Sequence, residues 1–148
     1  MVDWDEISVL YTNADCLTNK KSEFLLLLKT LKKKPSIIAI TEVKPKSAKY
    51  KLNASELSLE GYNIFHGGLE DSNLRGIVIY VDKYLKASPI SVPIDFQENI
   101  FIEIKGVNKK DTLVMGNIYR SPNSSFENNC KIIEAIDYIS NTYTCKKY

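Results

Sequence analysis

The chain has 148 residues, of which 44% are hydrophobic and 26% are charged, and this composition excludes disordered, collagen-like and repeat-array proteins. The net charge of +2 is too small to indicate nucleic-acid binding through charge alone. No apolar run approaches the roughly 20 residues that span a bilayer, so we expect no membrane partner. The three cysteines have no C-x-x-C spacing, so we expect an intracellular protein.

The first part of the chain predicts a βαβ unit. Residues 7–11 alternate apolar and polar positions and predict a half-buried strand. A cap-like stretch at 18–23 precedes apolar residues at helical spacing over 24–31, which predict a helix. The apolar run at 37–40 is typical of a strand covered on both faces. A strand, a helix and a strand in this order favour two parallel strands with a right-handed crossover.

The middle of the chain predicts a long surface connection followed by β structure. Residues 43–60 contain four lysines near their start and few large apolar side chains, as surface connections do. Strands are then predicted, between turn-forming residues, at 62–65, 76–81, 90–94, 100–105 and 112–119. The close spacing of the last two predicts an antiparallel hairpin.

The last predicted element is an amphipathic helix over 126–139. Its expected apolar face consists of Ile132, Ile133, Ala135, Ile136 and Ile139. Taken together, the elements predict one α/β (α+β) unit with a mixed sheet, because no repeat or linker divides the chain.

Polar residues follow three of the apolar strands. Asn13 and Asp15 follow the first strand, Glu42 follows the second and Tyr119 follows the last. Ligands of open α/β sheets gather at the carboxyl ends of strands, and a carboxylate that continues an apolar face is costly without a partner. Hard oxygen ligands with a nearby amide suit Mg²⁺ better than zinc. The alternative is that these carboxylates are simply solvated or cap the backbone.

Five segments carry a resemblance to a known family. In chain order they are 10–17 (LYTNADCL), 38–42 (IAITE), 59–65 (LEGYNIF), 75–81 (RGIVIYV) and 116–123 (GNIYRSPN). In this order they resemble the first half of the endonuclease/exonuclease/phosphatase superfamily, and in particular the endonuclease domains of LINE-type, non-LTR retrotransposons. The resemblance implies a two-sheet α/β sandwich with helices outside, nuclear location, and DNA phosphodiesters as the partner of the complete domain.

The resemblance also implies roles for individual residues. Asn13 is similar to the asparagine of the family's active-site floor, and Glu42 to the glutamate that binds the catalytic Mg²⁺, which Mn²⁺ can replace. Asp15 lies at a position whose acid supports the metal in related abasic-site nucleases. Tyr119 is similar to the tyrosine that hydrogen-bonds the scissile phosphate, and Arg120 is a further phosphate contact. For Arg75, a turn-stabilising role is at least as plausible as a role in the site.

Two motifs of the family are not found in this sequence. They are a Gly-Asp-x-Asn strand and a Ser-Asp-His motif, and the one histidine, His66, is expected in a loop with a surface or turn role. Proton transfer typically contributes 10²–10⁴-fold to such reactions, so we expect residues 1–148 to form the N-terminal part of a domain that is inactive alone. The alternatives are a phosphatase of the same superfamily and a non-catalytic nucleic-acid or protein-binding remnant.

The half-length chain also has a predicted consequence for folding. A two-sheet sandwich buries one face of each sheet against the other, so half of one is expected to expose a large apolar face. We therefore expect marginal stability or self-association through that face.

Overall fold

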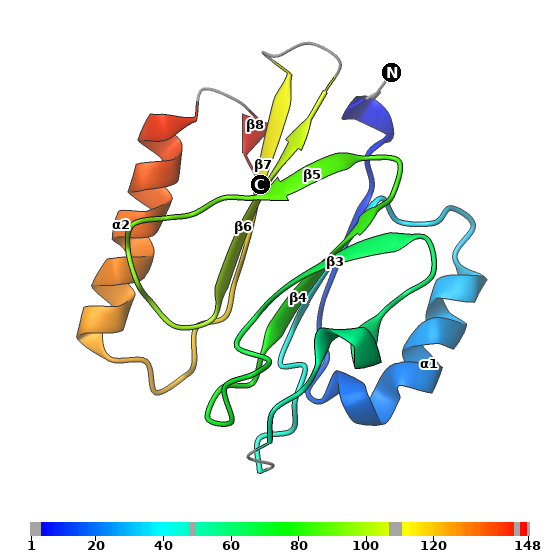
Figure 1. Cartoon of the computed structure of the whole chain (residues 1–148), viewed down its shortest axis with the longest axis horizontal. Helices are drawn as coiled ribbons and strands as arrows, with labels where there is room; N and C mark the ends of the chain where they lie inside the picture. The colour runs from blue at the N-terminus through cyan, green and yellow to red at the C-terminus, as the bar shows by residue number, and fades with distance from the viewer. Residues whose placement is uncertain (1–3, 48–49, 107–110, 144–145, 148) are drawn as a thin grey trace.

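Two four-stranded sheets pack face to face, and each carries a helix on its outer side (Figure 1). The computed structural model describes residues 4–47, 50–106, 111–143 and 146–147. The elements in chain order are η1 (Trp4–Glu6), β1 (Val9–Asn13), α1 (Leu17–Thr30), β2 (Ile37–Thr41), η2 (Ala54–Leu57), β3 (Tyr62–Gly67), β4 (Ile77–Asp82), β5 (Lys86–Pro89), β6 (Asn99–Lys105), β7 (Thr112–Ile118), α2 (Phe126–Thr142) and β8 (Lys146–Lys147). This is the mixed α/β, two-sheet architecture that the sequence predicted.

The first sheet has the order β1-β2-β4-β3 and the second has the order β5-β6-β7-β8. The predicted βαβ unit is confirmed, because β1 and β2 are parallel, with Val9 opposite Ile37. The predicted hairpin is also confirmed, since β6 and β7 are antiparallel with Ile102 opposite Met115. The short strand β8, which the sequence did not predict, lies parallel to β7.

The central core lies between the two sheets. Alternate residues of β2, β4, β6 and β7 point into it, and Ile37, Ile79 and Ile102 are completely buried there. Trp4 packs at the edge of this core, next to the start of β1. The buried amide of Asn117 on β7 crosses between the sheets and donates to the carbonyl oxygens of Ile40 (3.2 Å) and Val78 (3.1 Å).

Each helix covers the outer face of one sheet (Figure 1). Helix α1 buries Leu17 and Phe24 against the first sheet, and α2 buries Ala135 and Ile139 against the second. None of the helices in the described part of the chain is long and apolar enough to cross a membrane.

The expected apolar faces of both helices are only partly correct. On α2, Ile132, Ala135 and Ile139 pack against the sheet as expected, but Ile133 and Ile136 are 60% and 47% exposed, and Tyr138 packs there in their place. The residues predicted as a cap-like stretch already belong to α1, which begins at Leu17. Four leucines of this region are at least partly solvated, namely Leu25, Leu26, Leu27 and Leu31.

The expectation of a large exposed apolar face is wrong for most of the sandwich. The inner side chains of β2 and β4 pack against those of β6 and β7, so the two sheets already form a closed core between them. Among the described strand residues, the large apolar side chains that are exposed lie on β1, the edge strand of the first sheet, where Val9 and Tyr11 are 47% and 61% exposed. These residues share a face with the buried Ile37 and Ala39 of the neighbouring strand.

Two other segments differ from their predicted form. Residues 90–94 are not a strand, because Pro93 has no N–H to donate and the apolar side chains of Ile90, Val92 and Ile94 pack loosely against the outer core of the second sheet. The edge strand is β5 instead. The connection 43–60 includes a helical turn, η2, and it is not simply a surface loop, since it buries Val43, Lys44, Leu52, Leu57 and Leu59.

Candidate active site

The carboxyl ends of β1 and β2 and the start of β4 are held together by backbone hydrogen bonds. The pairing of β1 with β2 continues beyond the strands, from the Ala14 nitrogen to the Thr41 oxygen (3.0 Å) and from the Cys16 nitrogen to the Glu42 oxygen (2.8 Å). The Lys44 nitrogen donates to the Arg75 oxygen (2.7 Å). The candidate residues therefore come from segments that are fixed relative to one another, at the lower end of the molecule in Figure 1.

The backbone here is left-handed at three residues that are not glycine. The φ angles of Asp15, Cys16 and Glu42 are 40°, 82° and 55°. This conformation costs residues with a Cβ about 1–3 kcal/mol each and clusters at functional sites. The side chain of Asn13 supports the first turn, because its Oδ1 accepts the Asp15 N–H (3.0 Å).

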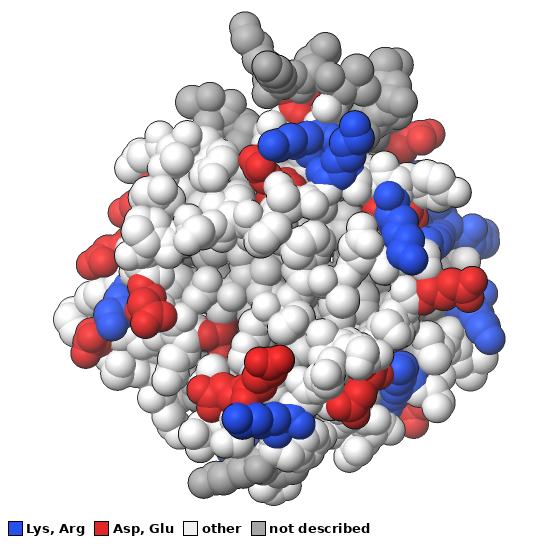
Figure 2. Space-filling model, in the orientation of Figure 1, with Lys and Arg blue, Asp and Glu red and all other residues white. Residues whose placement is uncertain are grey.

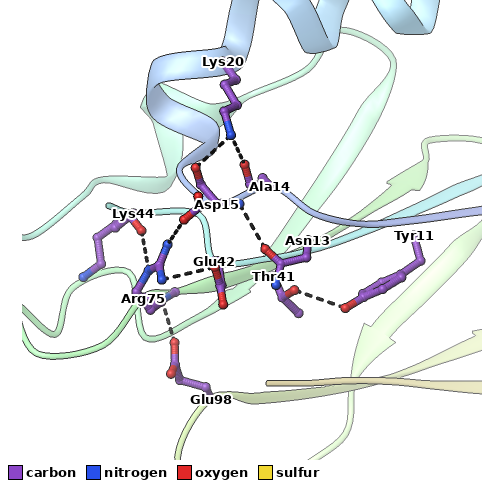
Figure 3. Close-up of polar contacts among 11 residues, drawn as sticks. Tyr11, Asn13, Ala14, Asp15, Lys20, Thr41, Glu42, Lys44, Arg75 and Glu98 are labelled. Atoms are coloured by element: carbon purple, nitrogen blue, oxygen red, sulfur yellow. Dashed lines mark hydrogen bonds and ion pairs between the residues drawn. The ribbon is translucent and has the colours of Figure 1, made fainter. Parts of the chain in front are cut away.

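Arg75 joins the two candidate metal ligands (Figure 3). Its Nη1 lies 3.1 Å from Oε2 of Glu42, and its Nη2 lies 2.9 Å from Oδ1 of Asp15. Its Nε donates to the Lys44 carbonyl oxygen at 2.8 Å. The side chains of Arg75 and Glu42 are each 15% exposed, whereas that of Asp15 is 75% exposed. The sequence left the role of Arg75 open, and the structure places it at the centre of the site.

Tyr119 reaches the same place from the second sheet. Burial raises the pKa of its phenol to about 12, helped by a hydrogen bond to Glu42 and by the negative charge of Glu42. The phenol is therefore neutral at pH 7 and able to donate a hydrogen bond. Asn13 lies on the neighbouring strand, with its Cα paired to that of Thr41, the residue before Glu42. The structure thus brings Glu42, Tyr119 and Asp15 into one network, with Asn13 at its side.

Glu98 supports this network from beneath, and sequence reasoning missed it. Its buried carboxylate accepts the Gly76 N–H at 2.7 Å and also bonds the Arg75 backbone, while its own carbonyl oxygen accepts the Tyr119 N–H at 3.0 Å. Burial raises the pKa of Glu98 despite these hydrogen bonds. Its left-handed backbone (φ 54°) was the kind of feature that a sequence does not reveal.

Lys44 is a second supporting residue that the sequence reading misjudged. It was expected on the surface, but it is completely buried, and its ammonium donates to the carbonyl oxygens of Tyr50 (3.2 Å), Leu69 (3.1 Å) and Asp71. Burial lowers the pKa of Lys44. These contacts tie the loop after β2 to the loop before β4, and Arg75 lies at the end of that second loop.

Two other residues lie outside the network. Arg120 is exposed, and its Nε donates to Oδ1 of Asn129 on α2 at 2.8 Å, so the side chain is directed at the helix. His66 lies within β3 and not in the predicted loop, and β3 is the edge strand opposite β1. It is exposed, in agreement with the expected surface position.

An open groove of about 760 Å³ lies beside Tyr119, between the loops that follow β3, precede β6 and follow β7. The acidic residues that line it are Asp71, Asp95, Glu98 and Glu127. Among the described residues it contains one cation, Lys131, which pairs with Glu127 at 2.9 Å. Figure 2 shows Lys and Arg side chains at several separate places on the viewed face, with acidic side chains close to most of them. The distribution of charges therefore does not favour binding of a nucleic-acid backbone in this groove or on this face.

The donor set at the site fits a hard divalent cation in kind. Glu42 and Asp15 offer carboxylate oxygens and Asn13 offers an amide oxygen, which are the ligand types that Mg²⁺ prefers. The described residues contain no group of three or more His, Cys, Asp or Glu side chains arranged to hold a metal. Water and substrate oxygens would have to complete the coordination, as is usual for Mg²⁺.

Comparison with known proteins was most informative for structures. No protein-family model and no curated protein matches the sequence. The fold matches the endonuclease domain of TRAS1, a telomere-specific non-LTR retrotransposon, with a TM-score of 0.64 and 14% identity over 92% of this chain and 54% of that one. It matches an AP endonuclease from Leishmania major with a TM-score of 0.62 and 13% identity over 93% and 47% of the two chains.

A third match is the 3'-5' exonuclease NExo from Neisseria meningitidis, with a TM-score of 0.59 and 14% identity over 91% of this chain and 53% of that one. These nuclease structures share the endonuclease/exonuclease/phosphatase fold, so the fold that the sequence resemblance implied is confirmed. The chain spans about half the length of each of them.

Proposed function

We propose that a chain with this endonuclease/exonuclease/phosphatase fold is the N-terminal part of a Mg²⁺-dependent phosphodiesterase domain that nicks DNA. The observation that carries the proposal is the network in which Glu42 contacts both Arg75 and Tyr119, at the ends of strands from two different sheets. A carboxylate, a neutral phenol and a guanidinium in one place are the groups that bind a cation and orient a phosphate.

Each residue has a proposed role in this chemistry. Glu42 and Asp15 would hold Mg²⁺ or Mn²⁺, with Asn13 beside them, and the bound cation would neutralise phosphate oxygens. The phenol of Tyr119, which its raised pKa keeps protonated at neutral pH, would transfer its hydrogen bond from Glu42 to the phosphate. Arg120 would have to leave Asn129 to reach the phosphate, so we assign it an accessory role.

We further propose that residues 1–148 bind the cation but do not turn over alone, and that DNA is the partner of the complete domain. The proposal rests on the missing Gly-Asp-x-Asn and Ser-Asp-His motifs and on the position of His66 in the opposite edge strand. It includes a nuclear location and self-association along β1, where Val9 and Tyr11 are exposed. A phosphatase of the same superfamily and a non-catalytic binding remnant are the competing functions.

Binding of Mn²⁺, followed by electron paramagnetic resonance, tests the site directly. We expect Glu42→Gln to weaken Mn²⁺ binding at least about tenfold, because a metal-binding carboxylate is replaced by a neutral amide. Glu134→Gln, an exposed residue of α2, is the matched control and should leave binding unchanged. Equal Mn²⁺ affinity in the wild type and Glu42→Gln would contradict the proposed metal site.

Assays with two substrates separate the competing functions. We expect the chain to leave supercoiled plasmid intact, and any shift that it causes in the anisotropy of a labelled DNA duplex to depend on both Mg²⁺ and Glu42. Mg²⁺-dependent release of phosphate from a phosphomonoester would favour the phosphatase. DNA binding that ignores both Mg²⁺ and Glu42→Gln would favour the non-catalytic remnant.

A further inference from the structure

Arg75 is the most completely anchored side chain of the candidate site. Each of its three guanidinium nitrogens has its own partner, namely Glu42, Asp15 and the carbonyl oxygen of Lys44. Its backbone is held on both sides as well, since its carbonyl oxygen accepts the Lys44 N–H and its N–H bonds Glu98. The Nε bond and the two backbone bonds therefore hold Arg75 in place independently of the two carboxylates.

The two carboxylates, by contrast, depend on Arg75. They project from neighbouring strand ends, and both belong to residues with left-handed backbones. Two negative charges brought this close repel each other unless a positive charge lies between them. The guanidinium supplies that charge, and its planar fork also sets the direction of each carboxylate.

We propose that Arg75 is a built-in counter-cation that competes with the divalent cation for Asp15 and positions Glu42. This inference rests on the proposed function, because it assumes that the same two carboxylates bind metal. The ion pair between Arg75 and Asp15 is the one that opens, because the Asp15 side chain is 75% exposed. The side chains of Glu42 and Arg75 are each 15% exposed, and they stay paired. Asp15 thus passes from the guanidinium to the incoming cation.

Two variants separate the charge of Arg75 from its shape. Arg75→Met removes the charge and keeps the length of the side chain. Arg75→Lys keeps the charge and loses the planar, forked guanidinium group. Because a fixed positive charge repels a divalent cation a few ångströms away, we expect Arg75→Met to bind Mn²⁺ at least about tenfold more tightly than Arg75→Lys. Arg75→Lys should bind Mn²⁺ within about threefold of the wild type.

A merely structural arginine would give a different pattern. Both variants lose the fork and should melt at a lower temperature than the wild type, so the melting temperature does not distinguish the roles. Only the competition predicts that Mn²⁺ affinity follows charge. Equal affinity in Arg75→Met and Arg75→Lys would overturn the inference, provided that Glu42→Gln weakens Mn²⁺ binding as expected. Absence of any Glu42-dependent binding in all three proteins would overturn the proposed function together with it.

A measurement on the wild-type chain covers the case in which Arg75→Met does not fold. The side-chain resonances of Arg75 are followed by ¹⁵N nuclear magnetic resonance while diamagnetic Mg²⁺ is added. We expect the Nη2 resonance to shift as Asp15 is released, while the Nε resonance stays in place because its bond to the Lys44 carbonyl persists. An Nη2 resonance that does not move at Mg²⁺ concentrations that saturate the site would overturn the competition.

Discussion

The Nδ2 atom of Asn117 lies 3.2 Å from the carbonyl oxygen of Ile40, so a buried side chain of β7 is hydrogen-bonded to the backbone of β2 in the other sheet. The same nitrogen also donates to Val78 of β4 at 3.1 Å. Glu42 lies two residues after Ile40, and Tyr119 lies two residues after Asn117. This amide therefore fixes the spacing of the two sheets directly beneath the candidate site.

Asn117→Ala tests this link. We expect it to lower the free energy of unfolding by about 1–3 kcal/mol, because two buried hydrogen bonds are lost and a cavity remains. Chemical denaturation with circular dichroism measures the change. Asn63→Ala, at an exposed position of β3, is the control and should change the free energy of unfolding by less than about 0.5 kcal/mol. A similar loss in both variants would mean that Asn117 does not hold the sheets together.

The buried carboxylate of Glu98 predicts an unusual pH dependence. Because the pKa of Glu98 in the folded chain is raised above its ordinary value of 4.5, the folded state holds this proton more tightly than the unfolded state does. The contribution of Glu98 to stability is therefore highest below pH 4.5 and falls as the pH rises through the raised pKa.

Comparison with Glu98→Gln isolates this contribution. We expect the difference in unfolding free energy, wild type minus Glu98→Gln, to decrease between pH 4 and pH 7. Urea denaturation at a series of pH values measures it. Glu103→Gln on β6 is the control substitution. If the difference in unfolding free energy between the wild type and Glu98→Gln instead grows with pH, Glu98 is stabilised in its charged form.

The phenol of Tyr62 predicts a loss of stability in alkali. Its hydroxyl donates to the carbonyl oxygen of Pro35 at 2.7 Å, and burial raises its pKa to about 12. Stability from this bond is complete below about pH 10 and is lost as the pH rises through about 12.

Absorbance at 295 nm follows the ionisation of tyrosines. We expect Tyr62→Phe to remove a component that titrates near pH 12 and to reduce the alkaline loss of stability. Tyr84→Phe, at a position that is 93% exposed, is the control and should leave the component near pH 12 in place. A titration near pH 10 for Tyr62 would contradict its hydrogen bond.

The exposed part of β1 predicts self-association. An edge strand with unpaired backbone groups and apolar side chains is a template for pairing with another chain. We expect light scattering after gel filtration to give a mass above 16.8 kDa for the wild type and a mass near it for Val9→Asp. Tyr84→Asp, at the turn after β4, is the control for surface charge and should associate like the wild type. A monomeric wild type would contradict the prediction.

The sequence predicted those features that depend on local pattern. Strands β2, β4, β6 and β7 are marked by runs of apolar residues, because both of their faces are covered. The position of Glu42 followed from its place at the end of such a strand. The neighbouring location of Tyr119 came from the family resemblance, since no rule of spacing relates residues so distant along the chain.

The sequence did not predict features that depend on contacts between loops. Lys44 looks like a surface residue until three backbone carbonyls are brought around it. The role of Arg75 depends on the turn that Glu98 holds, and the two residues lie in loops that precede strands of different sheets. Apolar residues alternate with other residues at 90–94 because this loop packs every second side chain against the core. The same pattern in a strand would look identical in the sequence.

The placement of the one tryptophan provides an internal optical reporter. Trp4 packs against the inter-sheet core before β1 begins, whereas the candidate site follows the end of that strand. Its fluorescence emission should therefore move to longer wavelength when the sandwich opens and stay constant when a cation binds at the opposite end. One fluorophore can thus distinguish a variant that has unfolded from one that has only lost its ligand.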